Sequence, residues 1–224
     1  MTSGLLHPVD LLRSRTIPLA SRSPWRAVAE LALLVVVFGL AYGAVMGMYA
    51  GPRGPRVTQM VYSATKVPLL LLLTFAISMP SFFVLNTLLG VRDDFADAVR
   101  ALVATQAALT IVLASLAPLT GVWYASVPGY REAILFNALM FGIASVAGQF
   151  LLRRLYRPLI ERNPKHRFLL RAWLIVFAFV GIQMGWVLRP FIGNPTGRTT
   201  FFRAGAWGNA YVEVANMIRE VLAG

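Results

Sequence analysis

The densest group of side chains that could do chemistry is an acidic cluster made of Asp93, Asp94 and Asp97. Asp93 and Asp97 are one helical turn apart, so their carboxylates could share a metal ion. However, no histidine or glutamate joins them, and the glycine-punctuated spacing of a calcium-binding loop is absent. Acidic side chains favour the first turn of a helix. We therefore interpret the cluster as the solvated start of a helix and predict no metal site.

Other catalytic and cofactor chemistries are limited by what the sequence lacks. It contains no cysteine, which removes thiolate nucleophiles, thiolate metal sites, disulfides and Fe–S clusters. Its two histidines, His7 and His166, lie in basic segments outside the long apolar runs, so a haem within a membrane has no histidine ligand. The hydrolase motifs G-x-S-x-G and H-E-x-x-H are missing. We predict a protein that is not an enzyme, with no catalytic residues and no cofactor.

Two groups of basic residues could hold an anion. The first is Arg189 with the loop Thr196–Arg203, the only such constellation in the C-terminal tail. The second is a run of seven basic residues between two apolar segments: Arg153, Arg154, Arg157, Arg162, Lys165, Arg167 and Arg171. This run is typical of the positively charged cytosolic loops of membrane proteins. It could also bind anionic lipids or an acidic partner, and the two interpretations are compatible.

The elements that must position these residues are membrane spans. The 224 residues are 58% hydrophobic and only 13% charged, whereas a soluble domain carries roughly a quarter charged residues. Apolar runs long enough to cross a bilayer predict spans at about 27–48, 67–89, 101–119, 133–152 and 172–188. The fold class is therefore all-α, a polytopic transmembrane helical bundle. The net charge of +12 is explained by loops and lipid head groups, so we expect no nucleic acid partner.

The segments outside this five-span membrane domain (26–189) are short. We predict a cytosolic or interfacial N-terminal arm over 1–25 and an extracytoplasmic tail over 190–224. The tail contains a short amphipathic helix over 209–222, with Asn209 as a possible N-cap. The segments on the N-terminal side carry 13 Lys and Arg against 8 on the other side. This bias predicts a cytosolic N-terminus in a bacterial inner membrane, although a sixth membrane segment in the tail stays open.

The span over 67–89 carries a proline near its middle. Pro80 removes one backbone donor and frees a carbonyl, which predicts a kink. Ser78 and Ser81 could bond the freed groups. Lys66, at the mouth of this span, is interpreted as an anchor that extends to the interface. The helix is either kinked and packed by small hydroxyls, or flexible and lining a substrate path.

Small residues mark the expected helix contacts. Gly39, Gly43 and Gly47 form a bare stripe of the G-x-x-x-G type, which allows another backbone to approach closely. We expect similar contacts at Ala138, Gly142 and Ser145, and at Gly181 and Gly185. The pattern does not say whether the partner helix belongs to the same chain or to a second copy.

Two segments resemble a known group of proteins. KVPLLLLLTFAISMPSFFVLNTLLG (66–90) and GIQMGWVLRPFIGNP (181–195) resemble bacterial membrane proteins placed near the Yip1 family. The resemblance implies about five spans and a cytosolic N-terminus, and it implies no catalytic residues.

Two functions are compatible with these observations. The first is a non-enzymatic scaffold or accessory subunit of a membrane complex, with membrane lipids (including anionic ones) and other membrane subunits or a second copy as partners. The alternative is a component of a small-solute or ion transporter or channel. It requires the polar side chains within the spans to converge on one cavity: Glu30, Gln106, Asn137, Gln149 and Gln183.

Overall fold

A computed structural model describes residues 23–49, 51, 56–127, 129–193, 199–203, 205–213 and 219. Its elements in chain order are α2 (Pro24–Gly47), α3 (Arg56–Leu88), the 3-10 turn η1 (Arg92–Asp94), α4 (Phe95–Ser126), α5 (Tyr130–Arg162) and α6 (Lys165–Leu188). The five α-helices are long and apolar enough to cross a membrane, which confirms the predicted fold class. Residues 1–22 of the predicted N-terminal arm lie outside the described residues.

The helices extend beyond the apolar runs from which the spans were predicted. α3 begins at Arg56 rather than near Val67, and α5 continues to Arg162. The basic run is therefore not a loop, because most of it lies on α5 and α6, and only Asn163 and Pro164 separate these two helices. The prediction was too short at these ends because a helix that leaves the hydrocarbon layer can continue through polar residues into the interface.

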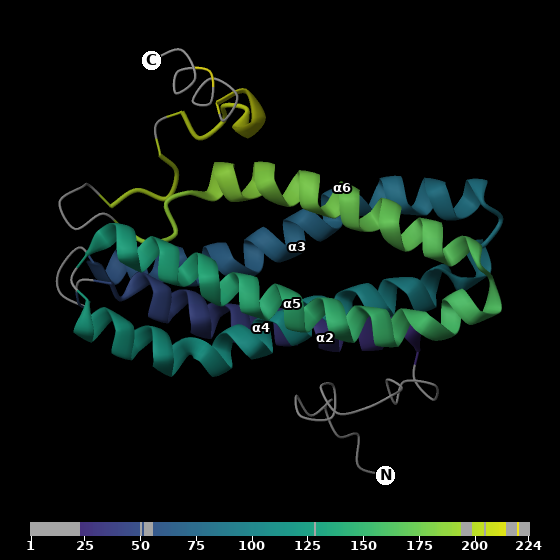
Figure 1. Cartoon of the computed structure of the whole chain (residues 1–224), viewed down its shortest axis with the longest axis horizontal. Coiled ribbons are helices and arrows are strands. Elements are labelled where there is room, and N and C mark those ends of the chain that lie inside the picture. Colours follow the sequence, from purple (N-terminus) through teal and green to yellow (C-terminus); the bar gives the residue numbers. More distant parts are fainter. Residues whose placement is uncertain are drawn as a thin grey trace, which may run out of the picture.

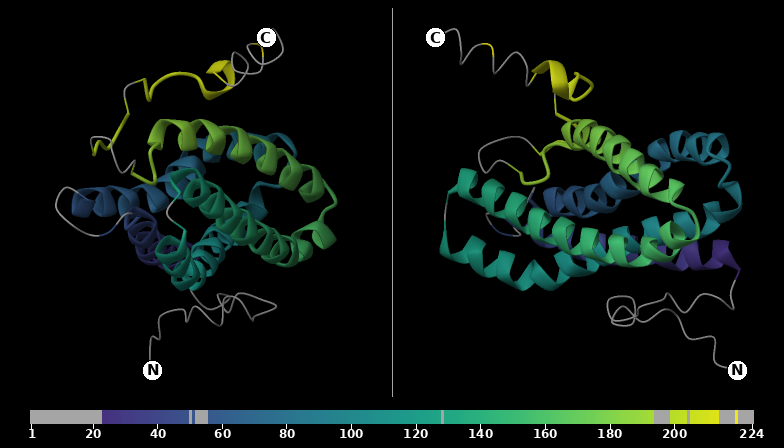
Figure 2. Two further views of the ribbon diagram at one scale, coloured as in Figure 1. Left: turned by 60° about the vertical axis from the view of Figure 1, so that its left-hand side comes forward. Right: turned by 45° about the vertical axis from the view of Figure 1, so that its right-hand side comes forward.

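The helices pack in the spatial order α6–α3–α2–α4–α5. Figures 1 and 2 show α6 lying along α3 on one side of the molecule, with α4 and α5 on the other side of α2. α5 and α6 are consecutive in the chain, yet they form the two edges of this array and touch each other little. α5 and α6 meet near the turn that joins them, where Tyr156, Leu159 and Leu169 share a hydrophobic cluster, and a cleft lies between them farther along.

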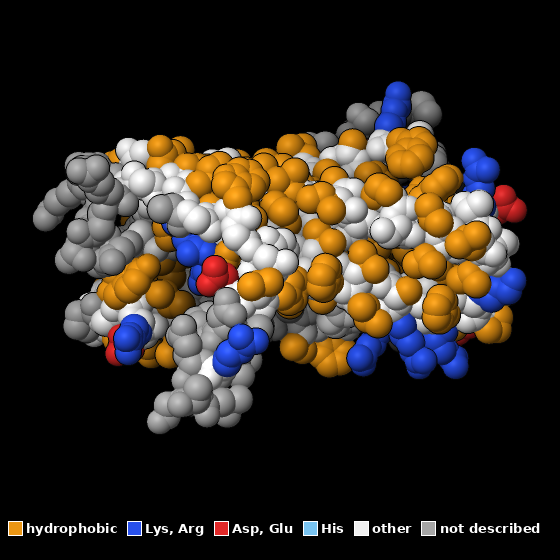
Figure 3. Space-filling model, turned by 90° about the horizontal axis from the view of Figure 1, so that it is seen from above, with side chains coloured by type: hydrophobic (Ala, Val, Ile, Leu, Met, Phe, Trp, Pro, Cys, Tyr) orange, Lys and Arg blue, Asp and Glu red, His pale blue; other side chains and the backbone are white. Residues whose placement is uncertain are grey.

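The most buried helix is α4. Small side chains fill its first half, where Ala101, Ala104, Ala107 and Ala108 are buried. Because these side chains are small, α2 and α5 can both pack closely on α4. The outer surface of the bundle is divided by side-chain type. In Figure 3 hydrophobic side chains occupy the middle of one face, and Lys and Arg gather toward its ends. This distribution fits a bilayer around the middle of the bundle.

The glycine stripe of α2 lies against α3 of the same chain. A Cβ atom built on Gly43 would lie 2.5 Å from the Ser63 carbonyl oxygen and 2.7 Å from the Ala64 Cα. One built on Gly47 would lie 2.6 Å from the Met60 Cα. One on Gly39 would meet Pro68 at 3.2 Å. The two backbones therefore approach too closely for any side chain at Gly43 or Gly47.

The second stripe does not make the helix contact expected of it. Ala138, Gly142 and Ser145 are exposed, and nothing lies within 4 Å of a Cβ built on Gly142. The face of α5 that packs on α4 is rotated by about one residue and includes Ala144 and Gly148. In α6, a Cβ on Gly181 would contact the Thr74 methyl at 3.5 Å, whereas Gly185 has no neighbour within 4 Å.

At Pro80 of α3 the predicted serine bonds are absent among the described residues, and the kink stays a prediction. The helix is continuous through Pro80, which is exposed together with Ser81. Ser78 is buried, and its hydroxyl has no hydrogen-bond partner among the described residues. Ser78 therefore faces the bundle, away from the side on which Pro80 lies. Neither serine forms the predicted bond to the freed backbone groups in this part of the chain.

Candidate functional site

The segment Arg189–Gly193, which follows α6, crosses the end of the bundle where α3 begins, and we call it the strap. Three consecutive strap carbonyls accept hydrogen bonds from the bundle. The Pro190 carbonyl accepts from Lys66 Nζ at 2.7 Å. The Phe191 carbonyl accepts from the Ser63 hydroxyl and from Gln59 Nε2, the latter at 3.3 Å. The Ile192 carbonyl accepts from the Tyr130 hydroxyl at 3.0 Å. These bonds hold the strap on α3 and α5.

Lys66 does not extend to the interface, so its prediction as an anchor was wrong. Its side chain is fully buried, with the ammonium group 4.9 Å from the centre of the Phe201 ring. The reason is the strap, whose Pro190 carbonyl offers a strong acceptor at this depth and so removes the need to reach water. We refer to this region as the Lys66 end of the bundle.

A buried polar network fixes the helices below the strap. Asn137 Oδ1 on α5 accepts a hydrogen bond from the Tyr42 hydroxyl of α2 at 3.0 Å. Its Nδ2 donates to the Tyr124 hydroxyl of α4 at 2.6 Å and to the Ala133 carbonyl at 2.7 Å. Asn137 thus joins three helices, and its amide is fully engaged in structure.

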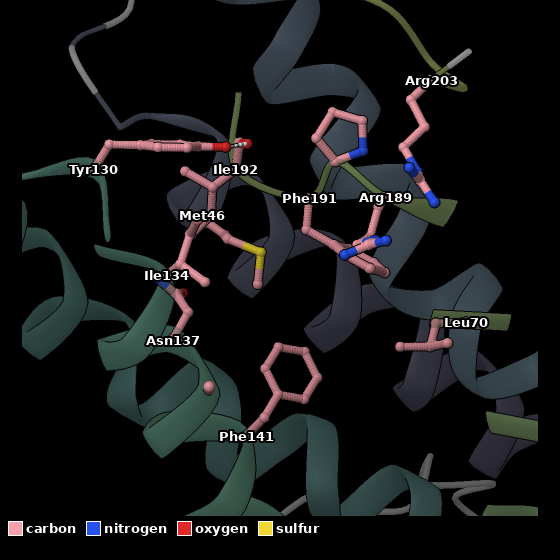
Figure 4. A pocket seen from close by; sticks show the side chains of 12 residues that line it. Met46, Leu70, Tyr130, Ile134, Asn137, Phe141, Arg189, Phe191, Ile192 and Arg203 are labelled. Atoms are coloured by element: carbon pink, nitrogen blue, oxygen red, sulfur yellow. Dashed lines mark hydrogen bonds between the residues drawn. The ribbon is translucent and has the colours of Figure 1, made fainter. Parts of the chain in front are cut away.

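Between the strap and the helices lies a cavity of about 550 Å³. Figure 4 shows how its lining side chains come from α2, α3, α5 and the strap, with Arg189 and Arg203 on one side. Its apolar wall includes Met46, Leu70, Ile134, Phe141 and Phe191. Ile134 and Ala138 are exposed on the outer face of α5, so the cavity meets the lipid-facing surface there. The volume lies in the range of ordinary small-molecule sites.

The cationic side of the cavity is organised around one indole. The guanidinium carbon of Arg189 lies 3.7 Å from the centre of the Trp186 ring, and that of Arg203 lies 4.3 Å from it. Both distances are in the range of cation–π contacts. Four buried donors around this ring have no hydrogen-bond partner among the described residues: Arg189 Nε, Arg203 Nε, Arg203 Nη2 and Trp186 Nε1.

Negative charge does not balance these cations within the described part of the chain. There, no carboxylate lies within ion-pair distance of Lys66, Arg189 or Arg203. Burial, followed by the neighbouring Arg203 guanidinium, lowers the pKa of Arg189 below its usual value. A guanidinium still remains charged at neutral pH, because it is the most basic of the side chains. One carboxylate lies nearby without pairing, because a Cβ built on Gly208 would lie 3.8 Å from Glu213 Oε1 and 3.9 Å from Trp186 Nε1. Within the described residues the guanidinium donors thus exceed the acceptors, which is the chemistry of an anion-binding site.

Contacts of the tail with α6 hold this region in place. Gln183 Nε2 donates to the Gly208 carbonyl, and Gln183 Oε1 accepts from the Ala210 amide, both at 3.0 Å. The Tyr211 hydroxyl donates to the Phe179 carbonyl at 2.6 Å. Asn209 caps the short helix as expected, since its Oδ1 accepts from the Tyr211 amide at 2.9 Å. Of the predicted helix over 209–222, residues 214–218 and 220–222 lie outside the described residues.

The acidic cluster lies at the opposite end, which we call the Arg162 end. Arg162 pairs with Asp94 at 3.0 Å and with Asp97 at 3.3 Å, and His166 Nε2 lies 3.1 Å from Asp94 Oδ2. Asp97 also pairs with Arg100. These contacts join η1 and the start of α4 to the end of α5 and the start of α6. No group of three or more side chains placed to hold a metal ion lies among the described residues.

The seven predicted basic site residues all lie at this end or next to it. Three of them are engaged within the chain, because Arg157 pairs with Glu161, Arg162 pairs with the acidic cluster, and Lys165 donates to the Leu89 carbonyl at 2.8 Å. Arg154 is half-buried and has a partner of its own. The other three are exposed: Arg153, Arg167 and Arg171.

The polar side chains considered for a transport path do not meet in one cavity. Asn137 lines the cavity at the Lys66 end, whereas Gln106 and Gln149 line a smaller cleft between α5 and α6. Gln183 is engaged with the tail backbone. The separation of these side chains does not favour a single polar path.

The sequence indicated Arg189 with the loop Thr196–Arg203 as a group that could hold an anion. Residues 196–198 lie outside the described residues, and the structure brings Arg189 and Arg203 together at Trp186. The sequence did not indicate Lys66 or Trp186 as part of this group. No local signal in the sequence indicates that Lys66 is buried, because its partner Pro190 is 124 residues away. Comparison of the chain with protein-family models, curated proteins and solved structures found no significant match.

Proposed function

We propose that this integral membrane protein is a non-enzymatic accessory subunit or scaffold that binds an anionic amphiphile in the cavity at the Lys66 end. The observation that carries the proposal is the group of three unpartnered guanidinium donors of Arg189 and Arg203 at one side of a mostly apolar cavity. Unpaired buried donors are costly, so a ligand that satisfies them is bound with a corresponding gain.

The ligand class follows from the two halves of the cavity. A phosphate or another oxyanion suits Arg189 and Arg203, because guanidinium groups bind such oxygens in a bidentate manner. An alkyl chain suits the apolar wall of Leu70, Ile134 and Phe141. A lipid with an anionic head group combines both parts, and its chains can reach the bilayer past Ile134 and Ala138. The buried charge of Lys66 adds to the attraction for the head group.

The excess of Lys and Arg on the N-terminal side supports a cytosolic N-terminus in a bacterial inner membrane. In this orientation the cavity lies in the outer half of the bilayer. Exposed Arg153, Arg167 and Arg171 then meet the head groups of the inner leaflet.

The test is a thermal titration in mild detergent with three additives: a short-chain phosphatidic acid, a phosphatidylcholine with the same chains, and inorganic phosphate. A ligand present at 100 times its Kd stabilises the folded state by about 2.7 kcal/mol. We expect phosphatidic acid to raise the unfolding temperature and phosphatidylcholine to leave it unchanged. A full effect of inorganic phosphate alone would show that the site recognises the oxyanion and not an amphiphile.

The variant that isolates the site is the double change Arg189→Gln and Arg203→Gln. It is expected to lose the response to phosphatidic acid. The matched control is Arg131→Gln, which removes an exposed charge from the same end of the bundle and keeps the response. If the double variant responds as strongly as the parent protein, the proposed site is wrong.

A further inference from the structure

The outer face of α5 carries a stripe of small side chains that nothing covers within the described chain. Ala138, Gly142 and Ser145 are exposed, and a Cβ atom on Gly142 would have no neighbour within 4 Å. Lipid-facing helix surfaces normally carry larger apolar side chains, as neighbouring Leu135 and Leu139 do. Small residues in a membrane helix allow close approach of another helix.

Beside the stripe lies the cleft between α5 and α6, with a volume of about 190 Å³. α4 forms its floor, and Ser145, Gln149 and Phe177 are among its lining residues. Gln106 of α4 also lines the cleft. It is only 5% exposed, and its Oε1 has no hydrogen-bond partner in the part of the chain that the structure describes. The cleft therefore contains an acceptor that needs a donor.

Lipid cannot supply that donor. Ser145 and Phe177 lie near the midpoints of α5 and α6, so the cleft lies deep in the hydrocarbon layer. Acyl chains have no hydrogen-bonding groups, and head groups and bulk water stay outside this layer. The volume is also below that of ordinary small-molecule sites, which begin at about 300 Å³. A side chain from another transmembrane helix can supply a donor at this depth and is small enough for this volume.

We propose that a second copy of this chain packs its α5 across the small-residue stripe of α5 and places a polar side chain in the cleft. Ser145 and Gln149 both lie at this face, and a hydroxyl or an amide can both donate and accept. In a two-fold dimer the same patch meets itself, so these groups are self-complementary. Ser145 or Gln149 of the partner subunit then donates to Gln106 Oε1 of the first copy.

The chain has no cysteine, so single cysteines can report this contact in native membranes. We expect Gly142→Cys to form a covalent dimer on mild oxidation, with twice the 24.6 kDa mass of the chain. The matched control is Ile175→Cys, on α6 at similar depth, where the side chain is 71% exposed to the surroundings. Equal cross-linking of the two variants, or a Gly142→Cys product only with a protein of different mass, would overturn the proposal.

A second variant separates association from folding. Gly142→Leu extends into open space within one chain, so the monomer is expected to fold with an unchanged unfolding temperature. The same leucine blocks the approach of a second α5. In a double variant that carries Leu139→Cys as the cross-linking reporter, Gly142→Leu is therefore expected to abolish the covalent dimer. The control carries Val146→Leu with Leu139→Cys and keeps the dimer. Retention of the dimer in the Gly142→Leu variant would contradict the proposed contact.

Discussion

Replacing Gly43 with alanine adds a single methyl group at the closest approach of α2 and α3. That methyl carbon would lie 2.5 Å from the Ser63 carbonyl oxygen and 2.7 Å from the Ala64 Cα. Both neighbours belong to the backbone of α3, so no side chain can turn away to make room. Ordinary contacts between such atoms are about 3.5–4.0 Å, and the two helices must therefore separate locally by about 1 Å.

The expected cost follows from comparison with a glycine that has free space. In Gly121→Ala, on α4, the added methyl group meets nothing within 4 Å. Both substitutions gain the same helix propensity of alanine over glycine, about 1 kcal/mol, so that this gain cancels in the difference. The remaining difference between the two free energies of unfolding is the cost of overpacking in Gly43→Ala, typically about 1–3 kcal/mol.

The assay is thermal unfolding of both variants in one mild detergent, followed by tryptophan fluorescence. For a chain of this size, 1 kcal/mol corresponds to about 2–4 °C, so Gly43→Ala should unfold at least that much below Gly121→Ala. If Gly43→Ala unfolds at the same temperature or above, the α2–α3 contact is not as close as described.

Three further substitutions can be read in the same assay. Lys66→Met removes the donor to the Pro190 carbonyl and is expected to lower stability by about 1–3 kcal/mol; unchanged stability would mean that the buried charge costs as much as its bond contributes. Asn137→Leu removes the acceptor of the Tyr42 hydroxyl and a donor to the Tyr124 hydroxyl, which keeps its bond to the Met46 carbonyl. We expect a loss of about 1–3 kcal/mol, with a neutral result arguing against the network. Arg157→Gln removes a pair with Glu161 in which both side chains are open to solvent, so a loss of more than about 1 kcal/mol would be inconsistent with this exposure.

The number and type of the membrane helices could be predicted from the sequence because each crossing requires a long uncharged run, and such runs are local features. The ends of the helices could not, since polar residues continue α5 to Arg162 without any change of helical pattern. The stripe at Gly43 was recognisable as a contact, but its partner depends on how α3 folds back in space.

Two residues show why the site was only partly predictable. Arg189 stood out because it follows an apolar run and precedes a loop with further arginines. Lys66 was assigned to the interface because that is where a lysine beside an apolar run is normally found. Its actual partner is the carbonyl of Pro190, 124 residues away in the sequence. No local pattern reports a bond of that kind.

The central claim, that the cavity at the Lys66 end holds an anionic amphiphile, is tested most directly by native mass spectrometry of the protein purified from membranes in mild detergent. We predict that the parent chain and Arg131→Gln retain a bound lipid with an anionic head group. We also predict that this adduct is lost when Arg189 and Arg203 are both replaced by glutamine. A parent chain without a selective anionic adduct, or a double variant that retains one, would contradict the account.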